Sequence, residues 1–186
     1  MKFGVSAVCC LVIFSAPAAS FAQTPAAPSG PVSALSVGKQ MYTTIKGYLL
    51  ASAEKLPEAD YAFKPTPEVR SFGGILGHVA TALYGPCAAL KGEQNPNKVN
   101  FEEKTARAEL IAAIKEGFAY CDAAIAGLSD DGALEMVKRG QRDVVRIAPL
   151  FVLVAHLNEH YGNLVTYMRL KGVVPPSSDK PGTSAK

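Results

Sequence analysis

The sequence predicts an all-α protein, a four-helix bundle, and three observations lead to this class. Apolar residues recur at helical spacing in four long segments. Proline, glycine and polar turn-forming residues lie between these segments, and none of them has a strong strand pattern. The chain has 186 residues, 48% of them hydrophobic, which is enough for one sizeable core and too short for two comfortable domains.

Residues 1–22 have the features of a secretory signal peptide. Lys2 supplies a positive charge, residues 3–14 are apolar, and small residues precede a predicted cleavage site after Ala22. The apolar stretch is too short to span a bilayer, and an uncleaved anchor is the alternative. We therefore expect a periplasmic or secreted protein that is free of the membrane after cleavage, with residues 23–31 as a flexible linker.

The first two helices are expected in the following sixty residues. Residues 32–56 have apolar side chains at helical spacing, and Pro57 ends this helix. The proline-containing segment 57–70 is expected to be an extended loop. Ser71 is suited to cap the N-terminus of a second helix over residues 72–91.

The last two helices are separated by a long connection. Apolar periodicity predicts a third helix over residues 105–128. Residues 129–147 form the connection, with two short strands or a turn of helix as the alternatives. The fourth helix, residues 149–170, begins with a proline, which suits a first turn. The predicted bundle domain is residues 32–174, and the tail 175–186 is expected to be disordered.

The charge of the chain excludes one class of partner. The net charge is +3, and the lysine and arginine residues are scattered rather than gathered in one patch. Nucleic acid is therefore not an expected partner. A small-molecule substrate is the expected partner. A homodimer is compatible with a bundle of this size, although no residue pattern indicates one.

Two of the three histidines, His156 and His160, are four residues apart in the fourth predicted helix. Residues at this spacing lie on one face of a helix, one turn apart, so both imidazoles can reach the same ion. The third, His78, lies in the second helix, and facing helices of a bundle can build a metal site from inward side chains. Small residues share its face and leave room beside the ring: Gly74, Thr81 and Gly85.

Three imidazoles with an open coordination position are typical of a catalytic or ligand-binding divalent-metal site. Imidazole suits zinc, nickel, copper and iron, and zinc or nickel is the expected ion. A pair of histidines at this spacing is a weak motif by itself. The alternative is that the rings are hydrogen-bonded to neighbouring residues and bind no ion.

Residues 156–160 also match the HxxEH pattern of inverted zinc proteases, with Glu159 as general base. That architecture needs a further carboxylate ligand well downstream, and the only acid after His160 is Asp179 in the tail. A protease is therefore not expected. Glu159, Asn163 and Tyr167 remain weak catalytic candidates, because solvation of Glu159 and core packing of Tyr167 explain these residues equally well.

Cleavage after Ala22 would leave Cys87 and Cys121 as the only cysteines. An even pair in an oxidising compartment is a candidate disulfide, and two buried free thiols are the alternative. Their spacing does not match a metal-ligand motif.

Two regions resemble the signature segments of the DinB-like superfamily of proposed metalloenzymes: PEADYAFKPTPEVRSFGGILGHVATALYG (57–85) and AHLNEHYGNLVTYMRLKGVVPPSS (155–178). The resemblance covers residues 35–178. It implies a four-helix bundle with up-down-down-up topology. It also implies a divalent-metal site whose three ligands carry over onto His78, His156 and His160.

The resemblance also bears on function and on the cysteines. Characterised relatives are thiol-dependent transferases or isomerases, and the predicted export of this chain departs from them. We expect a metal-dependent transferase or hydrolase acting on a small molecule, with a non-catalytic metal-binding or ligand-binding bundle as the alternative. The implied topology makes the second and third helices parallel, so that Cys87 and Cys121 lie at similar depth, which favours a disulfide.

Overall fold

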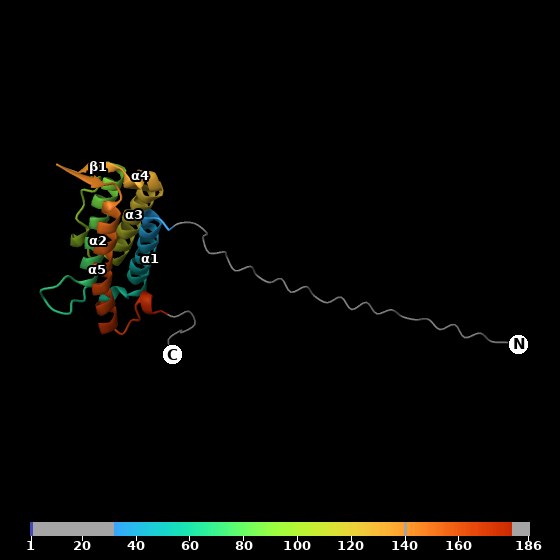
Figure 1. The fold of residues 1–186 in the computed structure, drawn as a ribbon. Helices are drawn as coiled ribbons and strands as arrows, with labels where there is room; N and C mark the ends of the chain where they lie inside the picture. Colours follow the sequence, from blue (N-terminus) through green and yellow to red (C-terminus); the bar gives the residue numbers. More distant parts are fainter. Residues whose placement is uncertain (2–31, 140, 180–186) are drawn as a thin grey trace. The chain divides into compact units, whose positions relative to one another are not determined.

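The computed structural model describes Met1, residues 32–139 and residues 141–179 (Figure 1). Apart from Met1, the predicted signal peptide (1–22) and linker (23–31) lie outside the described residues. The last part of the predicted tail, residues 180–186, lies outside them as well. Among the described residues, no helix combines the length and the apolar character that crossing a membrane requires.

Four long helices build the described domain, and each begins and ends within two residues of its prediction. Serines cap two of them, since Ser33 and Ser71 each accept a hydrogen bond from the backbone N–H three residues later. Gly92, with a φ of 73°, closes the second helix in the left-handed conformation that glycine adopts easily. The four are α1 (Ala34–Lys55), α2 (Phe72–Lys91), α3 (Arg107–Ala126) and α5 (Ala148–Leu170).

Shorter elements occupy the connections between the long helices. The segment between α3 and α5 contains both alternatives that the sequence left open, a short helix and a two-stranded hairpin. The strands pair antiparallel, with Met136 opposite Val145. The short elements are η1 (Glu58–Asp60), η2 (Phe101–Glu103), α4 (Asp130–Leu134), β1 (Met136–Arg139), β2 (Arg142–Val145) and η3 (Pro176–Ser178).

Side-chain contacts fix the directions of α1, α2 and α3. A Cβ built on Gly73, near the start of α2, would lie 3.1 Å from the Leu110 side chain, near the start of α3. Cys87 and Cys121, near the ends of the same helices, form a disulfide with Cα atoms 5.1 Å apart. Helices α2 and α3 are therefore parallel. The pairs Tyr42–Asp122 and Glu54–Lys115 show that α1 runs antiparallel to α3.

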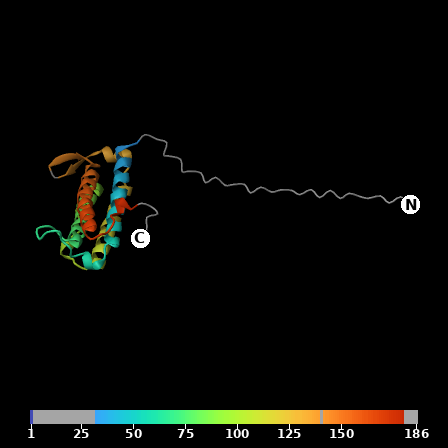
Figure 2. The same cartoon turned by 90° about the horizontal axis from the view of Figure 1, so that it is seen from below.

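Helix α5 completes the bundle between α1 and α2 (Figure 2). Tyr48 of α1 stacks on Tyr161, and Gly38 of α1 approaches Leu150, so α5 runs parallel to α1. The hydroxyl of Tyr167 donates to the backbone oxygen of Arg70, just before α2, which makes α5 antiparallel to α2. These directions confirm the predicted up-down-down-up four-helix bundle.

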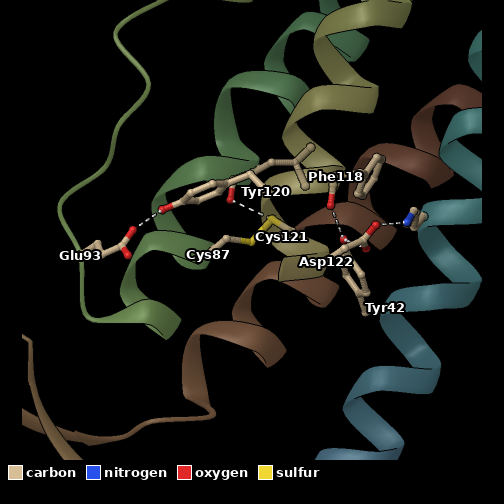
Figure 3. Close-up of a disulfide and its surroundings, with 9 residues drawn as sticks. Tyr42, Cys87, Glu93, Phe118, Tyr120, Cys121 and Asp122 are labelled. Carbon is tan, nitrogen blue, oxygen red and sulfur yellow. Dashed lines mark hydrogen bonds and ion pairs between the residues drawn. A yellow bond between two sulfur atoms is a disulfide. The ribbon is translucent and has the colours of Figure 1, made fainter. Parts of the chain in front are cut away.

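The core between the four helices consists mainly of leucine, isoleucine and aromatic side chains, and the disulfide lies within it (Figure 3). Both cysteines are fully buried. Tyr42 crosses from α1 to α3, where its hydroxyl donates to Asp122, which also pairs with Lys46. The largest fully buried side chains are Phe72, Phe118, Leu49, Leu56, Leu76, Leu83, Leu90, Leu110, Ile114, Leu150, Leu153 and Leu157.

The first residues of the predicted disordered tail are ordered in the structure. The N–H of Ser177 in η3 donates to the hydroxyl of Tyr161, 2.8 Å away, and Asp179 pairs with Lys55 of α1. The described fold therefore extends to Asp179 rather than ending at residue 174. Composition indicated disorder here because a proline-rich segment has little apolar surface, but hydrogen bonds and an ion pair to the bundle hold it.

Candidate metal centre

The three histidines, which come from α2 and α5, meet between these two neighbouring antiparallel helices. The Nε2 atom of His156 lies 3.1 Å from Nε2 of His78 and 2.9 Å from Nε2 of His160. One nitrogen of each ring lies within 4.8 Å of the other two, a grouping that could hold a metal ion. The structure thus brings together all three ligands predicted from the sequence.

The donor set fits a divalent ion better than it fits hydrogen bonding among the rings. Nε2 of His156 makes two close contacts, one with each of the other rings. If a single Nε2 proton forms a hydrogen bond in one contact, the other contact brings two nitrogen lone pairs together. Three nitrogens bound to zinc at about 2.0–2.1 Å and at tetrahedral angles would lie roughly 3.3–3.4 Å apart. The two contacts of His156 are slightly shorter than this spacing, and the remaining pair, His78 and His160, lies within 4.8 Å, so the three nitrogens lie close enough to share an ion after a modest rearrangement.

The histidines of α5 are held in the neutral form that metal binding requires. Burial, and then the neighbouring His78, lower the pKa of His156 below its ordinary value. Burial, followed by the positive charge that His156 and His78 would carry, lowers the pKa of His160 to about 4. Both rings are therefore neutral near pH 7, with lone pairs available to an ion.

Glu102, in the loop between α2 and α3, is a direct partner of the cluster. The Nδ1–H of His78 donates to Oε1 of Glu102 at 2.6 Å, and Nε–H of Arg70 donates to Oε2 at 2.9 Å. Burial alone would raise the pKa of Glu102, but the hydrogen bonds from His78 and Arg70 outweigh it and keep the pKa below its ordinary value. Glu102 is therefore a carboxylate at neutral pH.

A close approach of η2 to α2 brings Glu102 to this position. A Cβ built on Gly77 would lie 2.3 Å from the backbone oxygen of Phe101, so only glycine allows the two segments this close. Thr81, one turn further along α2, accepts a hydrogen bond from the N–H of Phe101. Gly77 and Thr81 therefore dock η2 on the helix face beside His78.

The role predicted for Thr81, one of three small residues near His78, is therefore corrected. Thr81 binds the η2 backbone rather than leaving room for the ring. A Cβ on Gly85 would meet nothing within 4 Å, and one on Gly74 would meet Ser71 and Arg70. At Gly77 and Thr81 this face of α2 is covered by η2, and helical periodicity does not reveal that the chain returns there.

A cavity of about 590 Å³ lies beside the cluster and has His160 in its wall. Two of the three weak candidates from the sequence line it: Asn163, which is exposed, and Tyr167, which is buried. Glu159 is exposed and is not part of the wall. The lining residues are Pro65, Thr66, Glu68, Val69, Arg70, Ile75, His160, Asn163 and Tyr167.

Sequence reasoning missed Glu102 and Arg70. Both lie in loops, where no periodicity assigns a direction to a side chain. Arg70 precedes the cap of α2, and Glu102 lies in a polar stretch with several other charged residues. The prediction of an extended loop over residues 57–70 is wrong at its start, where the chain forms η1, and part of the segment forms the cavity wall.

The fold and the histidines define a four-helix bundle with a candidate three-histidine metal centre. A family model described as the DinB superfamily matches residues 40–164. The chain belongs to the DinB superfamily. No curated protein matches it significantly in sequence.

Solved structures of low sequence identity share the fold. A DinB-like protein from Bacillus cereus has a TM-score of 0.63 and 16% identity over 75% of this chain and 93% of its own. A conserved protein from Enterococcus faecalis has a TM-score of 0.59 and 12% identity, and the match covers 74% of this chain and 96% of that protein. A DinB-like protein from Bacillus subtilis has a TM-score of 0.57 and 18% identity, and the match covers 76% of this chain and 99% of that protein. At these identities the likeness concerns the fold alone.

Proposed function

We propose that this protein is an exported metalloenzyme that binds one divalent ion, zinc or nickel, through His78, His156 and His160. It acts as a transferase or hydrolase on a small molecule bound in the adjoining cavity. The observation that carries the proposal is the convergence of three imidazole nitrogens beside a cavity of about 590 Å³. A divalent ion there would lower the pKa of a bound water or thiol and so supply a nucleophile near neutral pH.

The residues around the cavity have separate roles in this proposal. Asn163 offers an exposed amide that can orient a polar group of the substrate. Burial raises the pKa of Tyr167, and its hydroxyl already donates to the backbone oxygen of Arg70 at 2.7 Å. Tyr167 is therefore protonated at neutral pH and holds the cavity wall in place, rather than acting as a base.

The composition of the cluster favours catalysis over a purely structural ion. Among the described residues, the cluster contains three histidines and no carboxylate or thiolate as a fourth ligand. Structural zinc sites are usually closed by four protein ligands, whereas catalytic sites keep a position for water or substrate. The buried disulfide and the predicted signal peptide support export to an oxidising compartment.

Elemental analysis of untagged protein tests metal binding. The full-length chain is expressed in a bacterial host and purified from the periplasmic fraction without a histidine tag. We expect about one equivalent of bound divalent metal in the wild type and little in His156→Ala, because two remaining imidazoles bind an ion weakly. Glu159→Gln, an exposed neighbour outside the cavity wall, should keep its metal and serves as the control.

Two outcomes would contradict the proposal. A metal-free wild type after equilibration with zinc and nickel would remove the proposed centre. The predicted cleavage would be contradicted if the protein purified from the periplasm still began at its original N-terminus rather than at Gln23.

A further inference from the structure

We infer that Glu102 is a positioning residue of the metal centre, and that Arg70 in turn holds Glu102. The carboxylate fixes the ring of His78 with Nε2 turned toward the two histidines of α5. The inference rests on the proposed metal binding and adds two loop residues to it. Neither residue touches the proposed ion, so both would act through His78.

The hydrogen bond from His78 fixes the position of the ring proton. An ionised carboxylate can only accept hydrogen bonds, so the 2.6 Å contact between His78 Nδ1 and Glu102 Oε1 requires the proton on Nδ1. In a neutral ring the lone pair then lies on Nε2, the atom 3.1 Å from His156. Without this partner, the other tautomer would point an N–H group at the place where the ion binds.

His78 needs such a partner more than the other two ligands do. His156 and His160 belong to one helix, whose geometry sets their spacing. His78 comes from a different helix, so the geometry of α5 does not set the orientation of its ring, and its side chain is 23% exposed. Among the described residues, His78 alone has its outer ring nitrogen bound to a protein group. The Nδ1 atom of His160 is buried without a partner there.

Arg70 fixes the carboxylate in turn. Each oxygen of Glu102 binds one donor, Oε1 from His78 and Oε2 from Arg70 at 2.9 Å, so the plane of the carboxylate is defined. Arg70 also lines the cavity, and its backbone oxygen accepts the Tyr167 hydroxyl. A chain of direct contacts therefore runs from the cavity wall through Glu102 to a metal ligand.

Glu102→Gln tests the inference, with Co²⁺ as the probe. Glutamine keeps the shape but has one acceptor oxygen, so its NH₂ group must face one of the two donors. We expect Co²⁺ affinity, measured by competition titration of untagged protein, to fall roughly 10- to 100-fold. The visible spectrum of the Co²⁺ protein should also change, because the His78 ring is no longer fixed.

Glu103→Gln is the matched control, because Glu103 lies next in η2 and accepts a hydrogen bond from Asn100 rather than from a histidine. Its affinity and spectrum should equal those of the wild type. Arg70→Gln should weaken Co²⁺ binding less, on the order of 3- to 10-fold, since Glu102 keeps its bond to His78. If the effect of Arg70 passes through Glu102, the double variant binds no more weakly than Glu102→Gln alone.

The outcomes separate this inference from the proposed function. A wild type that does not bind Co²⁺ overturns both. A wild type that binds, together with a Glu102→Gln variant of unchanged affinity and spectrum, overturns the role of Glu102 alone. Additive losses in the double variant overturn the role of Arg70. If Glu102→Gln does not fold, as judged by circular dichroism, Arg70→Gln decides, and unchanged binding overturns the inference.

Discussion

His160 is the most deeply buried of the three candidate ligands, with 6% of its surface exposed. It is also the one of the three that lines the cavity. Burial has a consequence even without a metal ion. The buried ring binds a proton more weakly in the folded protein than in the unfolded chain. The free energy of unfolding therefore depends on pH.

The sign of this coupling gives a prediction for the metal-free protein. The pKa of His160 is about 4 in the fold against an ordinary value of 6.5, so below pH 6.5 the unfolded chain binds the proton first. We expect the free energy of unfolding to fall as the pH decreases from 7 to 5, with roughly 1–2 kcal/mol of the loss due to this residue. Urea unfolding of chelator-treated protein at both pH values measures the loss.

His160→Gln provides the comparison, because glutamine does not titrate. Its unfolding free energy should decrease less over the same pH interval, while carboxylates that titrate in both proteins cancel. Equal pH dependence in the two proteins would contradict the lowered pKa.

At the residue scale, the sequence was enough to find the three histidines of the candidate centre but not the residues that support them. Histidines are few in this chain, and the spacing of His156 and His160 places both on one helix face without knowledge of the fold. Glu102 has no such marker, because its contact with His78 depends on where the short turn η2 docks on the bundle. Side-chain directions in loops are set by tertiary contacts, which a local pattern does not contain.

At the element scale, η2 depends on one glycine of α2. Gly77→Ala would place a Cβ 2.3 Å from the backbone oxygen of Phe101, and backbone cannot move aside as a flexible side chain can. We expect η2 to shift and the protein to lose roughly 1–3 kcal/mol of stability, as overpacked sites do. Weaker Co²⁺ binding should accompany this loss, because Glu102 moves with η2. Thermal or urea unfolding and Co²⁺ titration measure the two effects.

Gly47→Ala in α1 is the matched control for this substitution. A Cβ there meets nothing within 4 Å, and the residue is exposed in the middle of a helix. Alanine should stabilise the helix by about 0.5–1 kcal/mol and leave metal binding unchanged. If Gly77→Ala were as stable as Gly47→Ala, the packing of η2 against α2 would not require glycine at position 77.

The long helices were predictable at this scale because apolar periodicity, capping serines and prolines all mark the same boundaries. The connection after α3 was not, since residues 129–147 satisfy both a short helix and a hairpin, and the structure uses both. The turn η3 was missed for a different reason. Its stability comes from contacts with Tyr161 and with α1, which lie far from it in the sequence.

At the scale of the whole molecule, α2 and α3 run parallel. The loop that joins them therefore passes back along α2, from the end of that helix to the level of its start, before α3 begins. The disulfide then joins the far ends of both helices, across a sequence separation of 34 residues. A cross-link of this length stabilises a fold mainly by restricting the unfolded chain. The topology could be expected only from the family resemblance, because helix periodicity does not specify direction.

Loss of this cross-link should lower stability by roughly 2–4 kcal/mol. We expect the urea midpoint of the wild type to fall when unfolding is measured in a thiol-free reductant. The double variant Cys87→Ala/Cys121→Ala should be less stable from the start and should not respond to the reductant. A wild type whose midpoint is the same with and without reductant would contradict a disulfide in solution.

The two histidine-bearing helices have no covalent bridge of their own, because the disulfide joins α2 to α3 and leaves α5 free. His78 and His156 are 78 residues apart in the chain, and a shared ion would tie the last long helix to the second. Ligand binding that requires the folded state stabilises it by mass action. Under the proposed metal binding, the supply of metal would then also govern how long the chain stays folded, and a chelator would shorten that time.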